Sequence, residues 1–355
     1  MEISITRIDQ PKAKPDESNL GFGTIFTDHM FTMDYTEGKG WHDARITPYS
    51  AFDMNPATMV LHYGQTIFEG LKAYRKEDGS VQLFRPRANF ERLNRSSEAL
   101  CMPQIDVNDA MEALMTLLEM EKEWVPSAPG TTLYIRPFCI AMDPYIGLKS
   151  SPMIRFMIIL SPVGAYYPEG FNPVKIWVSP EHVRAVRGGL GAAKTAANYA
   201  ASLYATEIAQ KEGYTQVLWL DGVERKYVEE VGSMNIFFVI DDEIVTPELS
   251  GGSILAGITR DSVLKLAAHQ GMKVAEKRIS IDEVFKAHEE GRLQEVFGSG
   301  TAAVISPVGH VKFGEKEITI GDGNSGPVAS GLFKDLMDIQ FGRTEDPMEW
   351  IVPVK

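Results

Sequence analysis

A proline- and glycine-rich segment near the middle of the chain places the strongest limit on how the chain can fold. Residues 162–173 read Pro-Val-Gly-Ala-Tyr-Tyr-Pro-Glu-Gly-Phe-Asn-Pro and separate two apolar runs. Proline and glycine at this density interrupt helices and strands, and such segments commonly connect domains. A chain of 355 residues is also long enough for two hydrophobic cores. We therefore expect an N-terminal arm (1–19), a smaller α/β domain (20–161), an interdomain loop (162–173) and a larger domain (174–355).

Both domains are predicted to mix strands and helices without strict alternation, which indicates a mixed α/β or α+β fold class. In the smaller domain the pattern predicts strands, or a strand and turn, at 58–68 and 70–74, strands at 81–84, 133–140 and 154–160, and helices at 87–100 and 107–124. In the larger domain it predicts strands at 174–178, 216–220, 233–240, 294–297 and 304–308, and helices at 194–211, 260–270 and 281–291.

The charge balance and the cysteine content limit the classes of molecule that this protein is expected to bind. The chain has 35 basic and 48 acidic residues, and the net charge of −13 disfavours attraction to nucleic acid or to anionic membranes. Cys101 and Cys139 are too few for a disulfide framework, and the seven histidines lack metal-ligand spacing. No apolar run reaches the length of a membrane helix, and the first residues lack a leader pattern. We expect a cytoplasmic protein that binds small molecules and holds no metal.

Lys194 is the first candidate for chemistry. It follows the glycine-rich run 188–193, Gly-Gly-Leu-Gly-Ala-Ala, and precedes an alanine-rich segment predicted to be helical. Because the neighbouring residues are small, a flat ligand can approach the amine closely. An unprotonated lysine at such a place can form a Schiff base with an aldehyde cofactor. From this segment alone, an ordinary solvated lysine is the better interpretation.

Two other motifs compete with this interpretation. Residues 188–195 differ by one residue from the phosphate-binding pattern G-x-x-x-x-G-K-[ST], and Asp221 after an apolar run resembles a magnesium ligand. However, Ala193 stands where that pattern needs glycine. Residues 298–303 match a dinucleotide-binding pattern, but a strand rather than a helix is expected after them. A nucleotide hydrolase therefore stays as the alternative of a different class.

Three further segments carry groups that a phosphorylated cofactor would need. Thr259 is predicted to cap a helix whose first amides can bind phosphate, although simple capping is equally favoured. Thr301 adds a hydroxyl in a glycine-containing turn, although an ordinary turn is the favoured interpretation of that segment alone. Of Glu229 and Glu230, at most one can point into a pocket if the chain is extended there, because neighbouring side chains of a strand face opposite ways. In isolation, a solvated acidic pair is the more favoured interpretation.

The order of eight motifs makes the pattern specific, and the chain resembles the branched-chain amino-acid aminotransferases, two-domain pyridoxal-phosphate enzymes of fold type IV that are similar to D-amino-acid aminotransferase. The resemblance extends from about Leu20 to Trp350. The motifs are Phe-Glu-Gly-Leu-Lys-Ala-Tyr (68–74), Phe-Arg-Pro (84–86), Tyr-Ile-Arg-Pro (134–137), Gly-Ala-Ala-Lys (191–194) with Asn-Tyr (198–199), Gln-Val-Leu-Trp-Leu (216–220), Glu-Val-Gly-Ser-Met-Asn (230–235), Gly-Ile-Thr-Arg (257–260) and Phe-Gly-Ser-Gly-Thr-Ala (297–302).

The resemblance implies which residues would bind pyridoxal 5'-phosphate, most of them in the larger domain. Lys194 would hold the cofactor as a Schiff base and shuttle the proton during transamination. The other cofactor contacts implied by similarity are Glu230 with the pyridine nitrogen, Tyr199 with the phenolic oxygen, Arg92, Ile258, Thr259 and Thr301 with the phosphate, and Ser233, which stands where many relatives have threonine.

The resemblance also implies the substrates and the assembly. The amino group would pass between L-leucine, L-isoleucine or L-valine and 2-oxoglutarate in a ping-pong cycle. Substrate contacts implied by similarity are the apolar wall of Phe22, Tyr63, Phe68, Tyr134 and Ala302, the carboxylate-binding Arg136, and Leu148 on a loop that reaches the pocket of a second subunit. A homodimer follows from that loop. A D-amino-acid aminotransferase or a lyase of the same fold stays as the related alternative.

Overall fold

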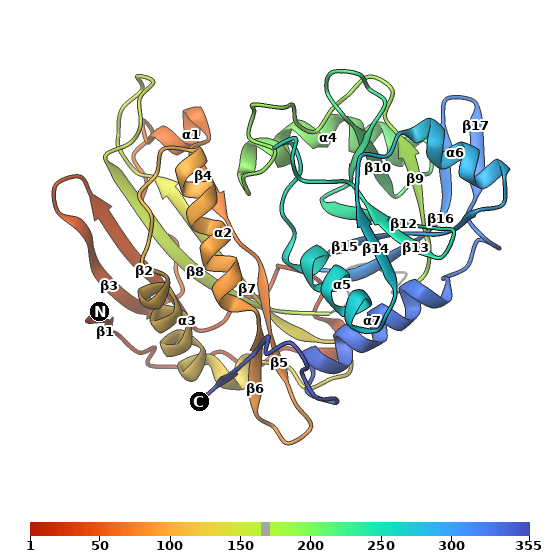
Figure 1. The fold of residues 1–355 in the computed structure, drawn as a ribbon. Helices are drawn as coiled ribbons and strands as arrows, with labels where there is room; N and C mark the ends of the chain where they lie inside the picture. Colours follow the sequence, from red (N-terminus) through yellow and green to blue (C-terminus); the bar gives the residue numbers. More distant parts are fainter. Residues whose placement is uncertain (165–170) are drawn as a thin grey trace. The chain divides into compact units, whose positions relative to one another are not determined.

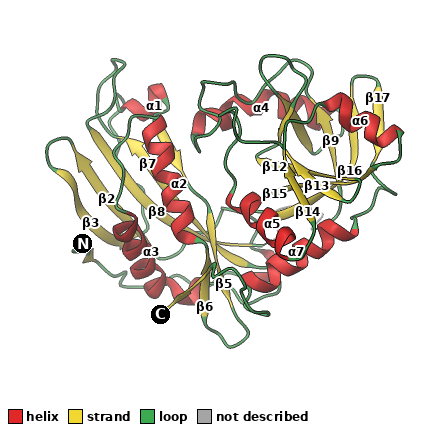
Figure 2. Cartoon of the chain, viewed as in Figure 1, coloured by secondary structure: helices red, strands yellow, loops and turns green. Residues whose placement is uncertain are grey.

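The chain forms two compact units, each built around one sheet. The computed structural model describes residues 1–164 and 171–355, so residues 165–170 of the predicted interdomain loop lie outside the described residues. Unit 1 comprises Met1–Tyr166, Ala193–Ala196 and Asp338–Lys355, and unit 2 comprises Tyr167–Ala192 and Ala197–Met337. Both chain ends thus belong to unit 1 (Figure 1). Each unit combines one sheet with helices, as the mixed class predicts (Figure 2).

The sheet of unit 1 runs in the order β1-β3-β2-β8-β7-β5-β6-β18, and β4 pairs with β7. Only the β1–β3 pair among these is parallel. The strands are β1 (Ser4–Ile5), β2 (His29–Thr36), β3 (Gly40–Pro48), β4 (Thr66–Phe68), β5 (Leu71–Arg75), β6 (Val81–Phe84), β7 (Thr132–Ala141), β8 (Met153–Val163) and β18 (Ile351–Val354). The helices are η1 (Glu17–Asn19), α1 (Met59–Tyr63), α2 (Pro86–Ala99), α3 (Val107–Glu121) and η2 (Lys122–Trp124).

Helix α3 illustrates why these residues form helices. Asp106 caps its start by accepting hydrogen bonds from the backbone N–H groups of Asn108 and Asp109. Leu114, Leu117 and other apolar residues recur at helical spacing and are fully buried. They join the core of unit 1, in which α3 contacts α2 and β2. The apolar face of α3 is therefore the reason that this helix docks on the sheet.

The sheet of unit 2 runs in the order β11-β10-β9-β16-β15-β12-β13-β14, and it mixes parallel and antiparallel pairs. β17 pairs with β16. The strands are β9 (Val174–Val178), β10 (Gln216–Leu220), β11 (Val228–Val231), β12 (Met234–Ile240), β13 (Glu243–Thr246), β14 (Lys273–Glu276), β15 (Leu293–Gly300), β16 (Val304–Phe313) and β17 (Lys316–Thr319). The helices are α4 (Ala196–Lys211), α5 (Ile258–His269), α6 (Ile281–Glu289) and α7 (Pro327–Gln340), the last of which crosses the unit boundary at residue 338.

Two local predictions are wrong in detail. The first part of the strand predicted over 58–68 is the helix α1, which ends at Gly64 in the left-handed conformation with φ 61°. A short apolar run fits a strand and a buried helical turn equally well, so the pattern alone could not separate them. Helix α4 begins at Ala196 rather than at Lys194. The main chain of Lys194 is instead bonded to α2 and β4.

Two segments belong to unit 1, although the prediction placed them in the larger, C-terminal domain. Residues 338–355 belong to unit 1, although the prediction placed all of 174–355 in the larger domain. The reason is a pairing between distant parts of the chain, because β18 forms an antiparallel pair with β6. Residues 193–196 also belong to unit 1, because Thr195 bridges Ile67 of β4. Lys194 and the strand β4 therefore share one unit.

Lys72 on β5 gives a prediction about stability and pH. The residue is buried, and burial lowers the pKa of its amine from 10.5 to about 8. Between these two values the unfolded chain binds the proton and the folded protein does not, so stability rises as the pH rises through this window. Below pH 8 the buried charge opposes folding. We expect Lys72→Met to increase the free energy of unfolding at pH 7 by up to about 3 kcal/mol.

Urea denaturation at pH 7 and pH 10.5 checks this expectation. The gain in the free energy of unfolding should shrink towards zero at pH 10.5. At that pH the amine of Lys72 is uncharged in the folded protein and carries its proton only in part in the unfolded chain. Lys211→Met is the control, because Lys211 is exposed in α4. A gain that is equal at both pH values would contradict the argument from burial.

Candidate active site

The segment around Lys194 is fixed through its main chain. The backbone N–H of Lys194 donates to Ser96 Oγ at 2.9 Å, and its carbonyl accepts from the N–H of Phe68 at 3.0 Å. Thr195 Oγ1 donates to the carbonyl of Thr66 at 2.7 Å. The half-buried side chain extends so that Nζ lies 4.9 Å from the centroid of the Phe68 ring. A lysine held in this way presents its amine from a rigid backbone beside an aromatic face.

A buried ion pair lies in the same unit. Arg92 of α2 donates through Nε to Glu69 Oε1 at 2.7 Å and through Nη2 to Glu69 Oε2 at 2.8 Å. Asn89 donates to the same carboxylate at 2.8 Å. Burial by itself would raise the pKa of the Glu69 carboxyl, but Arg92, Lys194 and Asn89 hold it below its ordinary value. The carboxylate therefore stays charged and orients Arg92. Sequence reasoning missed Glu69, and the signal was an acidic residue inside an apolar segment.

Four residues predicted to contact substrate gather in unit 1. The Phe22 and Tyr134 rings meet edge to face with centroids 5.1 Å apart. Arg136 Cζ lies 4.7 Å from the centroid of Phe68 and 5.3 Å from that of Tyr134, and Nη2 donates to the Tyr134 hydroxyl at 3.2 Å. Among the described residues, the buried Nε of Arg136 has no hydrogen-bond partner. The group therefore combines an apolar wall with a guanidinium that can bind a carboxylate.

Gly70 makes room for this arrangement. A Cβ at Gly70 would lie 2.1 Å from the hydroxyl oxygen of Tyr134. Real Cβ atoms do not approach so closely, so any larger residue would displace the Tyr134 ring or the strand that begins at Leu71. The glycine of the Phe-Glu-Gly motif thus has a steric role in placing the aromatic wall.

The other two substrate residues predicted in unit 1 lie at its surface. The Tyr63 hydroxyl donates to the carbonyl of Ile146, and the Tyr63 side chain is 40% exposed. Leu148 is 84% exposed, and its neighbours Tyr145 and Ile146 are exposed as well. Apolar side chains at such exposure form a surface suited to contact with another protein chain.

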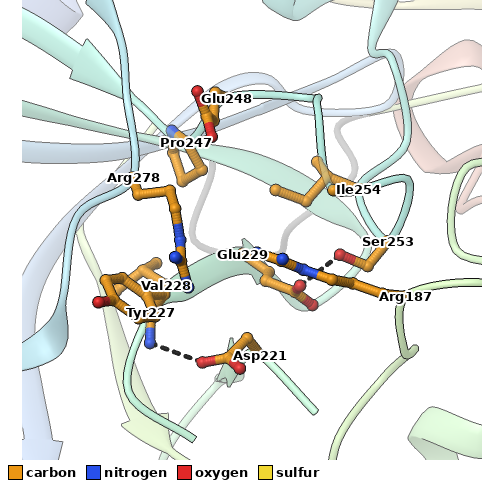
Figure 3. A pocket seen from close by; sticks show the side chains of 11 residues that line it. Arg187, Asp221, Tyr227, Val228, Glu229, Pro247, Glu248, Ser253, Ile254 and Arg278 are labelled. Atoms are coloured by element: carbon orange, nitrogen blue, oxygen red, sulfur yellow. Dashed lines mark hydrogen bonds between the residues drawn. The ribbon is translucent and has the colours of Figure 1, made fainter. Parts of the chain in front are cut away.

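Glu229 and Glu230 are both buried on β11, so the interpretation as a solvated pair is wrong. They point to different partners, as expected for neighbours on a strand. Glu230 Oε1 accepts from the backbone N–H of Leu255 at 2.7 Å, and Glu230 Oε2 lies 3.1 Å from Arg184 Nε. Glu229 accepts from the Ser253 hydroxyl and lines a cavity of about 30 Å³ (Figure 3). Burial raises the pKa of Glu229, although the Ser253 hydrogen bond and Arg184 oppose this.

The start of α5 offers backbone amides, but Thr259 is not its N-cap. The cap is Gly257 in an extended conformation, and no side chain caps the helix. The prediction was wrong by two residues because Ile258 already has helical geometry. A Cβ at Gly257 would lie 1.9 Å from Asn235 Oδ1, so only glycine fits there. Ile258 and Thr259 are therefore the first two helical residues, at the positive end of the helix.

The remaining predicted cofactor residues are spread over the loops and α4 of unit 2. Tyr199 is half-buried in the first turn of α4. Thr301 and Ala302 are half-buried in the turn between β15 and β16. Ser233 is exposed in the turn between β11 and β12. Their roles stay predictions.

The geometry contradicts both nucleotide-binding alternatives. The carboxylate of Asp221 accepts four backbone hydrogen bonds, from Val223, Glu224, Lys226 and Tyr227. Burial alone would raise its pKa, but these bonds lower the pKa to about 2. Asp221 thus organises a turn. Residues 298–303 belong to the hairpin of β15 and β16, so no helix follows the dinucleotide-like glycines. In the described part of the chain, no group of three or more His, Cys, Asp or Glu side chains is placed to hold a metal ion, and no helix is long and apolar enough to span a membrane.

Known proteins of one family match the chain in sequence and in structure. The class IV aminotransferase family matches residues 66–311. Branched-chain-amino-acid aminotransferase 2 of Bacillus subtilis (strain 168) is 56% identical over 352 residues, which cover 99% of this chain and 97% of that protein. The crystal structure of the Escherichia coli branched-chain amino acid aminotransferase matches with a TM-score of 0.76 and 28% identity, covering 91% of this chain and 99% of that one.

A third match concerns the cofactor. The T.th. branched-chain amino acid aminotransferase, solved with pyridoxamine 5'-phosphate, matches with a TM-score of 0.74 and 27% identity, covering 91% of this chain and 98% of that one. Pyridoxal 5'-phosphate is the cofactor of class IV aminotransferases, so the predicted cofactor is confirmed. From the family match and the near-complete alignment, the chain belongs to the class IV aminotransferases, in the group of the branched-chain-amino-acid aminotransferases.

Proposed function

We propose that this protein transfers the amino group between L-leucine, L-isoleucine or L-valine and 2-oxoglutarate in a ping-pong cycle that depends on Lys194. The observation that carries the proposal is Lys194 itself, fixed through its main chain with its amine beside the Phe68 ring. The names of the relatives support the substrate class, and the aromatic wall with Arg136 supports the use of both an aliphatic and an acidic substrate.

The residues present fit pyridoxal 5'-phosphate chemically. A pyridinium nitrogen needs a carboxylate that stays ionised, and Glu230 is buried with a backbone N–H donor and Arg184 beside it. A phosphate needs amides and hydroxyls, which the start of α5, with Gly257 as its cap, can supply. We assign the phosphate to Arg92, Ile258, Thr259 and Thr301, the pyridine nitrogen to Glu230, the phenolic oxygen to Tyr199, and a neighbouring hydroxyl to Ser233.

The chemistry then divides between the cofactor and the chain. When bound, pyridoxal phosphate withdraws electrons from the bonds at the substrate Cα. Lys194 Nζ would take the proton from the substrate Cα as a general base and would then, as a general acid, donate it to the cofactor carbon that receives the amino group. Glu230 keeps the ring nitrogen protonated and so favours electron withdrawal. Arg92, oriented by Glu69, holds the phosphate in place.

The same pocket must accept two kinds of side chain. Phe22, Tyr63, Phe68, Tyr134 and Ala302 would bury the methyl groups of leucine, isoleucine and valine. Burial of apolar surface contributes about 25 cal/mol per Å², so a few methyl groups suffice for useful binding. Arg136, whose side chain is half-buried, would receive the distal carboxylate of glutamate or 2-oxoglutarate through its guanidinium.

A homodimer and a cytoplasmic location are parts of the proposal. Leu148 lies on a strongly exposed apolar loop, which we assign to the pocket of a partner subunit. The mass in solution, measured by light scattering, tests the assembly, and a monomeric active enzyme would contradict it. Both cysteines are free, which supports a reducing compartment.

An assay of amino-group transfer tests the proposed reaction. With 2-oxoglutarate as acceptor, we expect glutamate to form from L-leucine, L-isoleucine and L-valine and not from D-alanine. Hydrophobic pockets distinguish one methylene by only about 1–3 kcal/mol, so all three branched substrates should react. Glutamate formed from D-alanine but not from L-leucine would instead support a D-amino-acid aminotransferase.

A further inference from the structure

Arg184 links three separate segments of unit 2 and is not among the residues assigned to the cofactor or substrate above. It lies between β9 and α4 and is 8% exposed. Its Nη2 donates to the carbonyl of Gly191 at 3.1 Å and to the carbonyl of Ser253 at 2.5 Å. Its Nε lies 3.1 Å from Glu230 Oε2 and forms an ion pair. One guanidinium therefore contacts the strand β11 and two loops.

The two loops approach each other so closely that their positions depend on one another. A Cβ at Gly191 would lie 2.1 Å from the carbonyl oxygen of Ser253. Gly191 is the third residue before Lys194. Two residues after Ser253, the backbone N–H of Leu255 donates to Glu230. Arg184 thus binds two loops. One leads to Lys194, and the other donates the Leu255 N–H to the Glu230 carboxylate.

Glu229, the acidic neighbour of Glu230, explains why a positive charge is needed beside these two carboxylates. Glu229 and Glu230 are adjacent and both buried, so two negative charges would repel each other in a medium of low dielectric constant. Glu229 accepts from the Ser253 hydroxyl, and its Oε2 has no hydrogen-bond partner among the described residues (Figure 3). Burial raises the pKa of Glu229 and Arg184 opposes this, while the 3.1 Å ion pair places the same guanidinium charge beside Glu230.

We infer that Arg184 is a positioning residue that holds the Glu230 carboxylate ionised and in place, and that ties it to the loop before Lys194. The inference rests on the proposed role of Glu230 at the pyridine nitrogen. Arginine suits this task because its planar fork reaches several acceptors at once, whereas a lysine ammonium on a flexible stem does not hold them in a fixed geometry. Arg184 acts through Glu230 and has no assigned contact with the cofactor.

The test compares Arg184→Met and Arg184→Lys with the wild-type holoenzyme. Four quantities are measured: the dissociation constant of pyridoxal phosphate, the pH midpoint of the visible band of the lysine-bound cofactor, kcat and KM. Without the cation, Glu230 takes up a proton more readily, and the ring nitrogen of the cofactor loses positive charge. Because this nearby positive charge is lost, the Schiff-base nitrogen of the lysine-bound cofactor keeps its own proton to higher pH. In Arg184→Met the pH midpoint of the visible band should therefore rise by about one unit, and kcat should fall roughly tenfold or more.

The lysine variant separates charge from geometry. Arg184→Lys keeps the charge, so its pH midpoint should stay near that of the wild type, while its kcat stays below the wild-type value because the fork is lost. Arg292→Met is the matched control, since Arg292 is an exposed arginine of unit 2 that pairs with Glu290 and Asp241. It should leave all four quantities unchanged.

Two outcomes overturn the inference in different ways. If Arg184→Met lowers only the melting temperature and leaves the pH midpoint, the cofactor affinity and kcat at their wild-type values, Arg184 is merely structural and the proposed function stands. If Glu230→Gln also has wild-type kinetics and a wild-type pH midpoint, the assignment of Glu230 fails, and the inference fails with it.

Discussion

Replacing Lys194 by alanine is expected to lower kcat for L-leucine by about three to four orders of magnitude, which is the scale of a lost general base. The variant should also lack the visible band of the covalently held cofactor, because it lacks the amine that lies 4.9 Å from the centroid of the Phe68 ring. The fold should survive. The main-chain bonds of residue 194 to Ser96 and Phe68 do not involve its side chain.

Lys211→Ala is the control for this experiment. Lys211 ends the helix α4, which begins two residues after Lys194, and its amine lies 3.8 Å from Glu207 at the surface. The control should keep the wild-type kcat and the visible band. Circular dichroism and melting curves of both variants separate a catalytic loss from unfolding. Turnover by Lys194→Ala at the control rate would refute the assignment of the nucleophile.

Breaking the buried pair of Glu69 and Arg92 is expected to have the largest effect on stability. Glu69→Ala removes the acceptor that Arg92 and Asn89 share, and it leaves Arg92 buried at 4% exposure without its carboxylate. Removing one partner of a buried pair costs about 3–5 kcal/mol. Urea denaturation of the apoenzyme measures this change directly. Since Arg92 would also lose its orientation, the affinity for pyridoxal phosphate should fall.

The double variant Glu69→Leu with Arg92→Met separates the two effects. Apolar residues of similar size can replace a buried ion pair with little loss of stability, so the double variant should recover most of the free energy of unfolding. Cofactor affinity should stay low, because the arginine assigned to the phosphate is gone. If Glu69→Ala changes the free energy of unfolding by less than about 1 kcal/mol, the Glu69–Arg92 ion pair does not stabilise the fold in the way that its burial predicts.

The sequence predicted those elements whose pattern is strong within a short window. The strands 174–178 and 216–220 have the predicted bounds, because both are largely apolar runs between turn-forming residues. The predicted helices at 87–100 and 107–124 correspond to α2 and to α3 with η2. The family resemblance and the cofactor are confirmed as well. They depended on the order of eight motifs rather than on any one of them.

Other features depend on contacts between distant residues and left no local signal. The β2–β3 hairpin was not predicted, although it forms a large part of the first sheet. The pairing of β18 with β6 joins residues that are far apart in the chain, so the final segment could not be assigned to unit 1 from its pattern. In the same way, Glu69 and Arg184 are charged residues whose burial becomes visible only when their partners are in place.

The central claim is that Lys194 holds pyridoxal phosphate and passes an amino group between branched-chain and acidic substrates. The most direct measurement is the visible absorbance spectrum of the purified holoenzyme before and after L-leucine is added. We predict a band of the lysine-bound cofactor that L-leucine abolishes and that 2-oxoglutarate then restores. A spectrum without such a band after incubation with pyridoxal phosphate, or a band that L-leucine leaves unchanged, would contradict the claim.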